Sequence, residues 1–187
     1  MIQYLLKTKK FIPNEFHNTF FDIDFDALYE QGKRLILTDL DNTLISYQET
    51  VPNKEIDDLF ESLQKKGFEI IIVSNNIQPR VDVFCEGLNI EGHANMRKPF
   101  IFKFKRIIKN TLRDYKKDEI VIIGDQLMTD IYGANRLQTY SILVNPIKKK
   151  TEKWYTRLNR KMEETKLNQI GKKFPETYEK LKLQERV

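Results

Sequence analysis

The sequence has few of the residues that build cross-linked or membrane-spanning proteins. Its 187 residues include one cysteine and two histidines, which excludes an intramolecular disulfide and a histidine-rich metal cluster. No apolar run approaches the roughly 20 residues of a membrane-spanning helix, and the first residues lack the long apolar segment of a secretory signal. There is no internal repeat and no low-complexity linker. We therefore expect a folded protein of a reducing compartment, with a cytoplasmic location.

Charge is distributed unevenly along the chain. The net charge is +5, yet residues 148 to 187 hold 13 basic and 6 acidic side chains, a net charge of +7, which leaves −2 for residues 1 to 147. The basic character therefore belongs to the C-terminal tail. Hydrophobic residues make up 40% of the chain, which is enough for one core and little for two full domains.

Short apolar runs alternate with amphipathic segments between residues 33 and 145. Strands are expected at residues 35–37, 70–73, 93–95, 120–123 and 141–144. Helices are expected at residues 53–66, 79–88, 99–115 and 129–137. The alternation predicts an α/β fold, a three-layer Rossmann-like parallel sheet with helices on both faces. We expect an aromatic-rich helical approach at residues 1–32, the core at 33–147 and a basic helical tail at 148–187.

Two of the expected helices have terminal signals. The first has Asn53 as its N-cap and Gly67 as its stop. The helix at 99–115 is expected to place Pro99 at its first position and to bury a stripe that includes Leu112.

Polar residues follow four of the predicted strands at the point where each strand ends. They are Asp39 and Asp41, Ser74-Asn75-Asn76, Arg97-Lys98-Pro99, and Gly124-Asp125 with Asp130 five residues later. Ligands in open parallel sheets bind outside the carboxyl ends of the strands. The four loops are therefore expected to converge on one pocket.

The residue types at these strand ends suit phosphoryl transfer. A carboxylate can attack phosphorus and form an acyl phosphate, and Asp39 is the expected nucleophile. Asp41 can protonate the leaving oxygen and later take a proton from the hydrolytic water. The Ser74 hydroxyl can donate to phosphoryl oxygens, and Lys98 can neutralise both the phosphate and the nucleophile.

Acidic residues at two strand ends predict a metal site. Asp39 and Asp125 are expected to bind a hard divalent cation and Asp130 to hold a metal-bound water, and we include Asp41 in the ligand set. Oxygen ligands that leave room for several waters fit Mg²⁺ best.

The motifs, taken in order, resemble those of the haloacid dehalogenase-like phosphatases. More narrowly, the chain resembles the YqeG family of subfamily IIIA over roughly residues 11 to 160. The segments that carry this likeness are Asp39-Leu40-Asp41-Asn42-Thr43-Leu44, Ile72-Val73-Ser74-Asn75-Asn76, Arg97-Lys98-Pro99 and Ile123-Gly124-Asp125-Gln126-Leu127-Met128-Thr129-Asp130. Relatives of this family include phosphatidylglycerophosphate phosphatases. The resemblance therefore implies a phosphomonoester hydrolase that produces phosphatidylglycerol.

Four residues beside the motifs are assigned to substrate binding. They are Asn42, Thr43, Asn75 and Asn76. Each interval between the first three motifs is short, because 33 positions separate Asp41 from Ser74 and 24 separate Ser74 from Lys98. One helix and one strand fill each interval. No large cap domain is expected, and the pocket should be open.

The tail leaves alternatives open for the partner. Trp154, Leu158 and Met162 recur at four-residue intervals among basic residues, which fits either a helix that binds an anionic membrane surface or one that packs on the domain. The same charge could hold nucleic acid, with the site processing polynucleotide ends, although no nucleic-acid motif is present. A soluble sugar or nucleotide phosphatase is a further alternative. The sequence does not define the oligomeric state.

Two other features have competing interpretations. The phenylalanines of the approach segment are expected to dock on the core, with contact to acyl chains as the alternative. Arg80 could reach a distal phosphate or form a surface salt bridge at a helix start.

Overall fold

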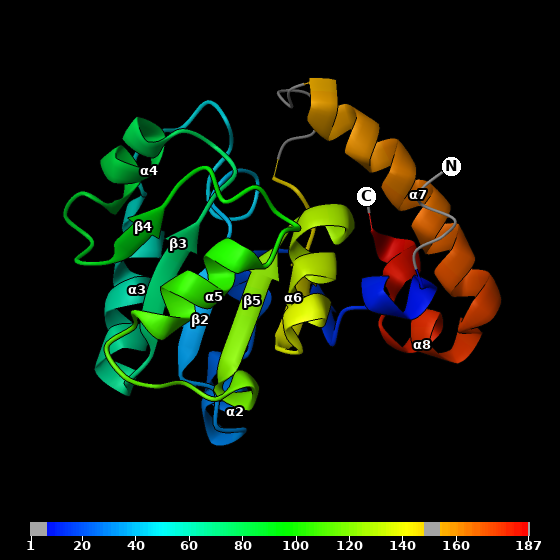
Figure 1. The fold of residues 1–187 in the computed structure, drawn as a ribbon, viewed down its shortest axis with the longest axis horizontal. Coiled ribbons are helices and arrows are strands. Elements are labelled where there is room, and N and C mark those ends of the chain that lie inside the picture. The colour runs from blue at the N-terminus through cyan, green and yellow to red at the C-terminus, as the bar shows by residue number, and fades with distance from the viewer. Residues whose placement is uncertain (1–6, 148–153, 187) are drawn as a thin grey trace.

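The computed structural model describes residues 7–147 and 154–186, and for residues 154–160 it describes the backbone alone. The centre is a six-stranded sheet in the order β1-β6-β5-β2-β3-β4, and every neighbouring pair is parallel (Figure 1). The strands are β1 (Glu15–His17), β2 (Leu35–Thr38), β3 (Glu69–Val73), β4 (Glu91–His93), β5 (Ile120–Gly124) and β6 (Tyr140–Val144). The predicted α/β class is confirmed.

Helices cover both faces of the sheet. The α-helices are α2 (Phe25–Glu30), α3 (Lys54–Lys66), α4 (Gln78–Cys85), α5 (Phe102–Lys109), α6 (Tyr132–Leu137), α7 (Trp154–Lys173) and α8 (Pro175–Lys180). Shorter turns of helix are η1 (Thr8–Phe11), η2 (Phe20–Asp22), η3 (Lys117–Glu119), η6 (Leu183–Glu185) and the π-helix η4 (Leu127–Ile131).

The strands build two cores because successive side chains point to opposite faces. On one face, Ile36 and Ile70 pack with α2, α3 and α4. On the other, Leu35 and Leu37 pack with α5 and α6. The central strands are buried on both sides, so their sequences read as continuous apolar runs.

The terminal signals of α3 are confirmed. The Asn53 side chain accepts a hydrogen bond from the amide of Ile56, and Gly67 ends the helix in the left-handed conformation at φ 105°. A residue without Cβ adopts this conformation without steric penalty.

The prediction for α5 was wrong at both ends. The helix begins at Phe102, and Pro99 lies before it in a turn where the amide of Phe100 donates to the carbonyl of Arg97. The Lys98–Pro99 peptide bond is cis. The helix ends at Lys109, and Leu112 is 91% exposed rather than buried. The amide of Leu112 faces the Glu69 side chain at the start of β3. Leu112 therefore lies at the amino ends of the strands, opposite the carboxyl ends that carry the motifs.

The N-terminal segment contains a strand that the sequence analysis did not predict. β1 pairs with β6, and beside it the Asn14 side chain accepts hydrogen bonds from the amide and the hydroxyl of Ser141. Phe11, Phe20 and Phe25 of this segment are buried, as the docking hypothesis expects. Three residues are too few for a periodic hydrophobic signal, which is why the strand escaped prediction.

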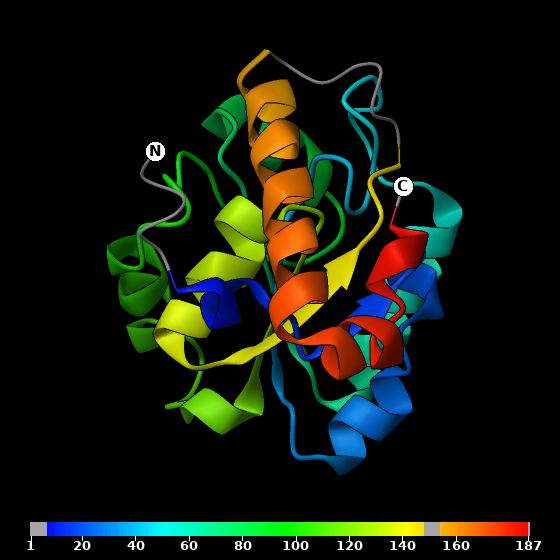
Figure 2. The same cartoon turned by 90° about the vertical axis from the view of Figure 1, so that its right-hand side faces the viewer.

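A third apolar cluster joins the C-terminal helices to the edge of the sheet. Ile170 of α7 and Leu183 pack with Phe11, Leu127 and Leu143, so α7 lies along the β6 side of the molecule (Figure 2). The side chains of Trp154 and Leu158, on which the amphipathic interpretation depends, lie outside the described residues. None of the described helices is long and apolar enough to cross a membrane.

Candidate active site

The predicted motifs meet at the carboxyl ends of β2 and β5, which are neighbours in the middle of the sheet. From β2 the chain runs outward through β3 and β4, and it then returns to β5 on the other side of β2. In open parallel sheets, ligands bind outside the carboxyl ends of the strands at the point where the strand order reverses in this way. Asp39 follows β2 directly, and its amide extends the ladder by donating to the carbonyl of Ile123 at 2.9 Å.

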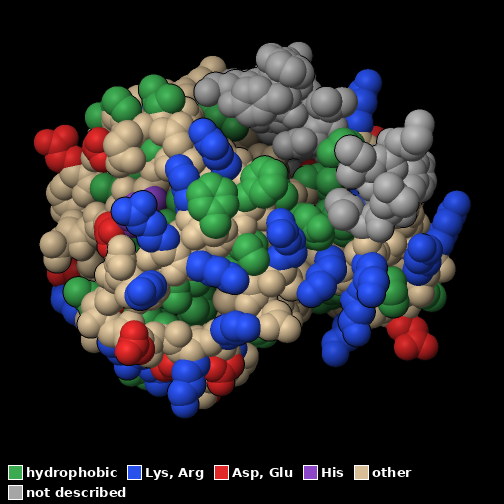
Figure 3. All heavy atoms as spheres, viewed as in Figure 1, with side chains coloured by type: hydrophobic (Ala, Val, Ile, Leu, Met, Phe, Trp, Pro, Cys, Tyr) green, Lys and Arg blue, Asp and Glu red, His purple; other side chains and the backbone are tan. Residues whose placement is uncertain are grey.

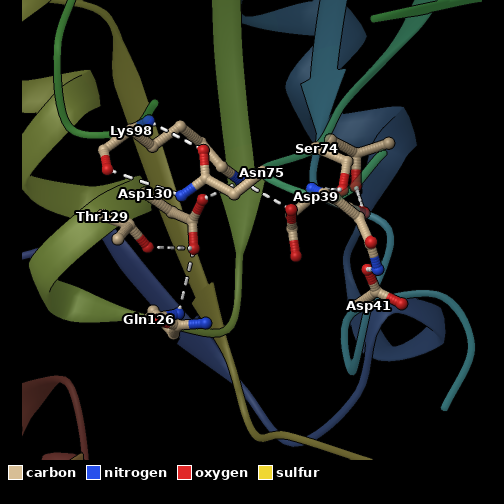
Figure 4. A network of polar contacts seen from close by, with 10 residues as sticks. Asp39, Asp41, Ser74, Asn75, Lys98, Gln126, Thr129 and Asp130 are labelled. Atoms are coloured by element: carbon tan, nitrogen blue, oxygen red, sulfur yellow. Dashed lines mark hydrogen bonds and ion pairs between the residues drawn. The ribbon is translucent and has the colours of Figure 1, made fainter. Parts of the chain in front are cut away.

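Lys98 links two of the carboxylates at these strand ends. Its Nζ lies 2.5 Å from Oδ1 of Asp39 and 2.6 Å from Oδ1 of Asp130 (Figure 4). All three side chains are buried. Burial alone lowers the pKa of Lys98, but the carboxylates of Asp130 and Asp39 raise it above its usual range. Lys98 is therefore a permanent cation in contact with the predicted nucleophile.

Three carboxylates come together around this point. Ligand oxygens of Asp39, Asp125 and Asp130 all lie within 4.8 Å of one another. Burial raises the pKa of Asp39 well above its usual range; Lys98 opposes the rise, and the neighbouring carboxylates add to it. Clustered buried carboxylates repel one another unless a cation lies between them. The donor set therefore fits a hard divalent cation.

The geometry of Asp130 depends on Gly124. A Cβ atom at residue 124 would lie 2.3 Å from Cγ of Asp130, so only glycine allows the strand end to approach this carboxylate. Asp130 Oδ2 accepts hydrogen bonds from the Gln126 amide and the Thr129 hydroxyl, each at 3.2 Å. The π-helix η4 presents Asp130 toward Lys98 and fixes both carboxylate oxygens.

Asp41 points away from this cluster. One of its carboxylate oxygens contacts the Arg80 guanidinium at 2.7 Å, and the other accepts from Nδ2 of Asn76 at 2.9 Å. The structure therefore brings three of the four predicted metal ligands together and directs the Asp41 side chain to Arg80 and Asn76. Figure 4 shows Asp41 apart from Lys98 and Asp130. Arg80 forms an ion pair, as one of its two interpretations expected, but the prediction of a surface position was wrong because both side chains are largely buried.

Comparison with known proteins places this chain in a family. Residues 1–148 match the family model described as mitochondrial PGP phosphatase. The "Probable phosphatase YqeG" of Bacillus subtilis (strain 168) is 37% identical over 165 residues, which cover 88% of this chain and 94% of that protein. The chain belongs to this phosphatase family. The predicted resemblance to the YqeG family, and the expectation of an enzyme, are thereby confirmed.

Solved structures support the fold of this phosphatase. An uncharacterized protein from Listeria monocytogenes serotype 4b has a TM-score of 0.51 at 19% identity, covering 64% of this chain and 85% of its own. A hypothetical protein from Xanthomonas campestris has a TM-score of 0.51 at 12% identity, covering 76% and 79%. At these identities the likeness concerns the fold alone.

Residues beside the motifs of the phosphatase have structural partners. The Asn75 side chain accepts from the amide of Lys98 at 2.8 Å and so joins the second and third motif loops. Ser74 is buried, and its hydroxyl accepts from the amide of Asn76 at 3.0 Å. Asn42 turns the first loop with φ 66°. The hydroxyl of Thr43 is buried and accepts or donates no hydrogen bond among the described residues.

Two residues of the tail hold the fourth motif loop of the phosphatase, and sequence reasoning missed both. Glu163 of α7 accepts from the amide of Leu127, the first residue of η4. Arg186 donates to the carbonyls of Asp125 and Val144 and lies 3.2 Å from the Glu163 carboxylate. The Glu163 and Arg186 side chains are 3% and 4% exposed. No local sequence pattern predicts such contacts, because 36 positions separate Leu127 from Glu163 and 61 separate Asp125 from Arg186.

Proposed function

We propose that the phosphatase hydrolyses a phosphomonoester through a phosphoryl group carried transiently on Asp39. The observation that carries the proposal is the contact of Lys98 with both Asp39 and Asp130 inside a buried group of three carboxylates. A nucleophilic carboxylate with a fixed cation beside it is suited to attack a phosphate dianion.

The reaction takes two steps at Asp39. Its carboxylate oxygen forms a bond to phosphorus while the bond to the leaving oxygen breaks, and Asp41 supplies the proton that the leaving oxygen takes up. In the second step Asp41 takes a proton from water, the water oxygen bonds to phosphorus, and the bond from phosphorus to Asp39 breaks. Inorganic phosphate leaves, and the Asp39 carboxylate is restored.

Asn76 and Arg80 hold the acid–base residue in place for these transfers. They contact different oxygens of Asp41, so the carboxyl group cannot rotate freely. The Ser74 hydroxyl, Thr43 hydroxyl and amide groups of the motif loops are proposed to bind phosphoryl oxygens. Lys98 offsets negative charge on the nucleophile and on the phosphate, which is where positive charge helps most.

The cofactor we propose is Mg²⁺, held by Asp39, Asp125 and Asp130. The donors are all carboxylate oxygens, and their mutual distances fit one hard ion. When bound, the ion neutralises the carboxylates and the phosphate, so that the two anions can approach each other.

The substrate we propose is phosphatidylglycerophosphate, which the reaction would convert to phosphatidylglycerol. The family description supports this choice. The described residues 41 to 98 hold α3, β3, α4 and β4 without an inserted cap domain, which leaves room for a headgroup presented at a surface.

Phosphate release tests the proposal. Purified protein with Mg²⁺ would be given phosphatidylglycerophosphate in mixed vesicles, and in parallel a panel of sugar phosphates, nucleotides and phosphate-ended oligonucleotides. Selective turnover of the lipid, absent in Asp39→Asn, is the expected result. Turnover restricted to soluble or polymeric esters would overturn the substrate and keep the chemistry, whereas full activity of a folded Asp39→Asn variant would overturn the mechanism.

A further inference from the structure

Two exposed phenylalanines lie next to the active site. Phe100 is 59% exposed and Phe102 is 56% exposed, and they follow the buried Lys98 by two and four positions. Figure 3 shows exposed hydrophobic side chains in the middle of the face that carries α5, with Lys and Arg side chains on several sides. Exposed apolar side chains that gather on one surface often mark an interaction site.

The phenylalanines stand in a basic and acid-free stretch. Residues 92 to 113 contain seven Lys and Arg and no Asp or Glu. Phe104 and Ile107 form the buried face of α5. The exposed face therefore presents Phe102 together with Lys105 and Arg106, which lie three and four positions further along the helix.

A second element adds positive charge to the same surface. Arg136 of α6 is exposed, and its guanidinium donates to the carbonyl of Pro99 at 3.1 Å. Lys109, one turn beyond Lys105, is exposed as well. We call the set Phe100, Phe102, Lys105, Arg106, Lys109 and Arg136 the α5 patch.

We propose that the α5 patch docks on the surface of an anionic lipid bilayer. Its combination of aromatic side chains and basic residues matches what the interface requires, since the rings enter the boundary between headgroups and acyl chains while the cations meet anionic headgroups. The docked face carries the loop of Lys98, so a phosphate in the headgroup layer would lie close to the active site. The proposal rests on the proposed function for the lipid substrate, but the binding itself needs no turnover.

The patch differs from the predicted membrane contact of the tail. Among the described tail residues, Met162, Leu167 and Ile170 pack against the domain, and Lys166 is buried over the ring of Phe11. The α5 patch offers apolar and basic side chains that face outward from the core.

Vesicle binding by the full-length Asp39→Asn protein tests the proposal without turnover. Binding would be measured by co-sedimentation with phosphatidylcholine vesicles that contain or lack phosphatidylglycerol. The double variant Phe100→Ser/Phe102→Ser is expected to bind anionic vesicles at least about tenfold more weakly. Lys105→Glu is expected to weaken binding by on the order of tenfold, because it reverses one charge at the surface.

Matched controls separate the patch from general effects of polarity and charge. Leu112→Ser removes an apolar side chain that is even more exposed, at 91%, near the end of the sheet opposite the active site. Lys65→Glu reverses a charge on α3, where Lys65 is 71% exposed. Both should bind like the parent protein. Because all the substituted side chains are exposed, thermal unfolding should change little in any variant.

Three results would overturn the docking surface. They are equal vesicle binding by patch and control variants, patch-dependent binding to duplex or single-stranded oligonucleotides without vesicle binding, and a self-association that Phe100→Ser/Phe102→Ser abolishes. If the patch binds vesicles but the active protein ignores phosphatidylglycerophosphate, the substrate assignment fails and the docking surface stands. If the lipid is hydrolysed equally well by patch variants, the docking surface fails alone.

Discussion

The carboxylate of Asp41 is held by two side chains, since Arg80 lies 2.7 Å from one oxygen and Asn76 lies 2.9 Å from the other. Both partners come from the segment after β3, so the first and second motifs are joined through the proposed general acid. Arg80→Met should lower turnover of an alkyl phosphomonoester by roughly tenfold to a thousandfold, because a mispositioned acid protonates the leaving oxygen poorly.

A comparison of two leaving groups distinguishes the loss of Asp41 positioning in Arg80→Met from a general loss of active structure. With p-nitrophenyl phosphate, whose leaving group needs little protonation, the loss should be much smaller. Arg113→Met is the matched control, because Arg113 pairs with Glu119 at the surface. An equal loss with both esters would contradict the assigned role of Arg80.

Gly124→Ala should distort the loop of residues 124 to 130, which carries the proposed metal ligands Asp125 and Asp130. The new methyl group would meet the Asp130 carboxylate at 2.3 Å, and we expect a loss of about 1–3 kcal/mol in the free energy of unfolding, as for overpacked cores. Mg²⁺ affinity, measured by calorimetry, should fall with it. Gly133→Ala is the control, because its nearest neighbour would be 3.8 Å away and alanine favours the helix. Unchanged Mg²⁺ affinity in Gly124→Ala would contradict the assignment of Asp125 and Asp130 as metal ligands.

Arg186→Met tests how the tail supports the site. Removing the cation that faces the buried carboxylate of Glu163 should reduce the free energy of unfolding by about 3–5 kcal/mol. Glu163→Gln/Arg186→Met should recover part of this loss in a double-mutant cycle. Both free energies are measured by urea unfolding, with Lys180→Met on the exposed face of α8 as the control. Strict additivity of the two substitutions would show that the residues act independently.

Metal-free protein should become less stable as pH rises. The raised pKa of Asp39 means that the folded state holds the proton of this carboxyl group more tightly than the unfolded chain does. The loss of folding stability from ionising Asp39 is therefore absent below the unfolded pKa of about 4 and grows as pH rises toward the folded pKa. Without metal at neutral pH, Asp39→Asn should therefore melt at a higher temperature than the wild type. The difference should shrink near pH ~4.

Mg²⁺ and a surface variant provide the controls for this pH dependence. The ion should stabilise the wild type and have little effect on Asp39→Asn or Asp125→Asn. Asp58→Asn, on the exposed face of α3, should not change the melting temperature at either pH. A metal-free Asp39→Asn protein that melts below the wild type at neutral pH would contradict the proposed repulsion.

The sequence predicts the centre of this molecule better than its periphery. Asp39, Ser74 and Asp125 follow strands that have clear apolar runs. Because the strands are parallel, their carboxyl ends lie at one end of the sheet, and these three residues come together there. Lys98 is harder, because its strand β4 has three residues, yet motif order places it correctly. By contrast, Leu112 was expected on the buried stripe of α5, and the helix had already ended.

Long-range polar contacts are what the sequence could not reveal. Nothing local distinguishes Glu163 from the other charged residues of a basic tail, and its role appears only when α7 packs beside η4. Arg80 is similar, because an arginine in the first turn of a helix has no intrinsic partner until the fold brings Asp41 to it. Such contacts depend on tertiary packing rather than on hydrophobic periodicity.

Chemical trapping of the phosphorylated enzyme tests the central claim most directly. Asp41→Asn protein, in which hydrolysis of the intermediate should be slow, would be mixed with Mg²⁺ and p-nitrophenyl phosphate and then treated with borohydride, which reduces an aspartyl phosphate to homoserine. Peptide mass spectrometry should find this product at position 39, and Asp39→Asn/Asp41→Asn protein should show none. Turnover of the ester with no reduction product at position 39, or with the product at another residue, would contradict the proposed mechanism.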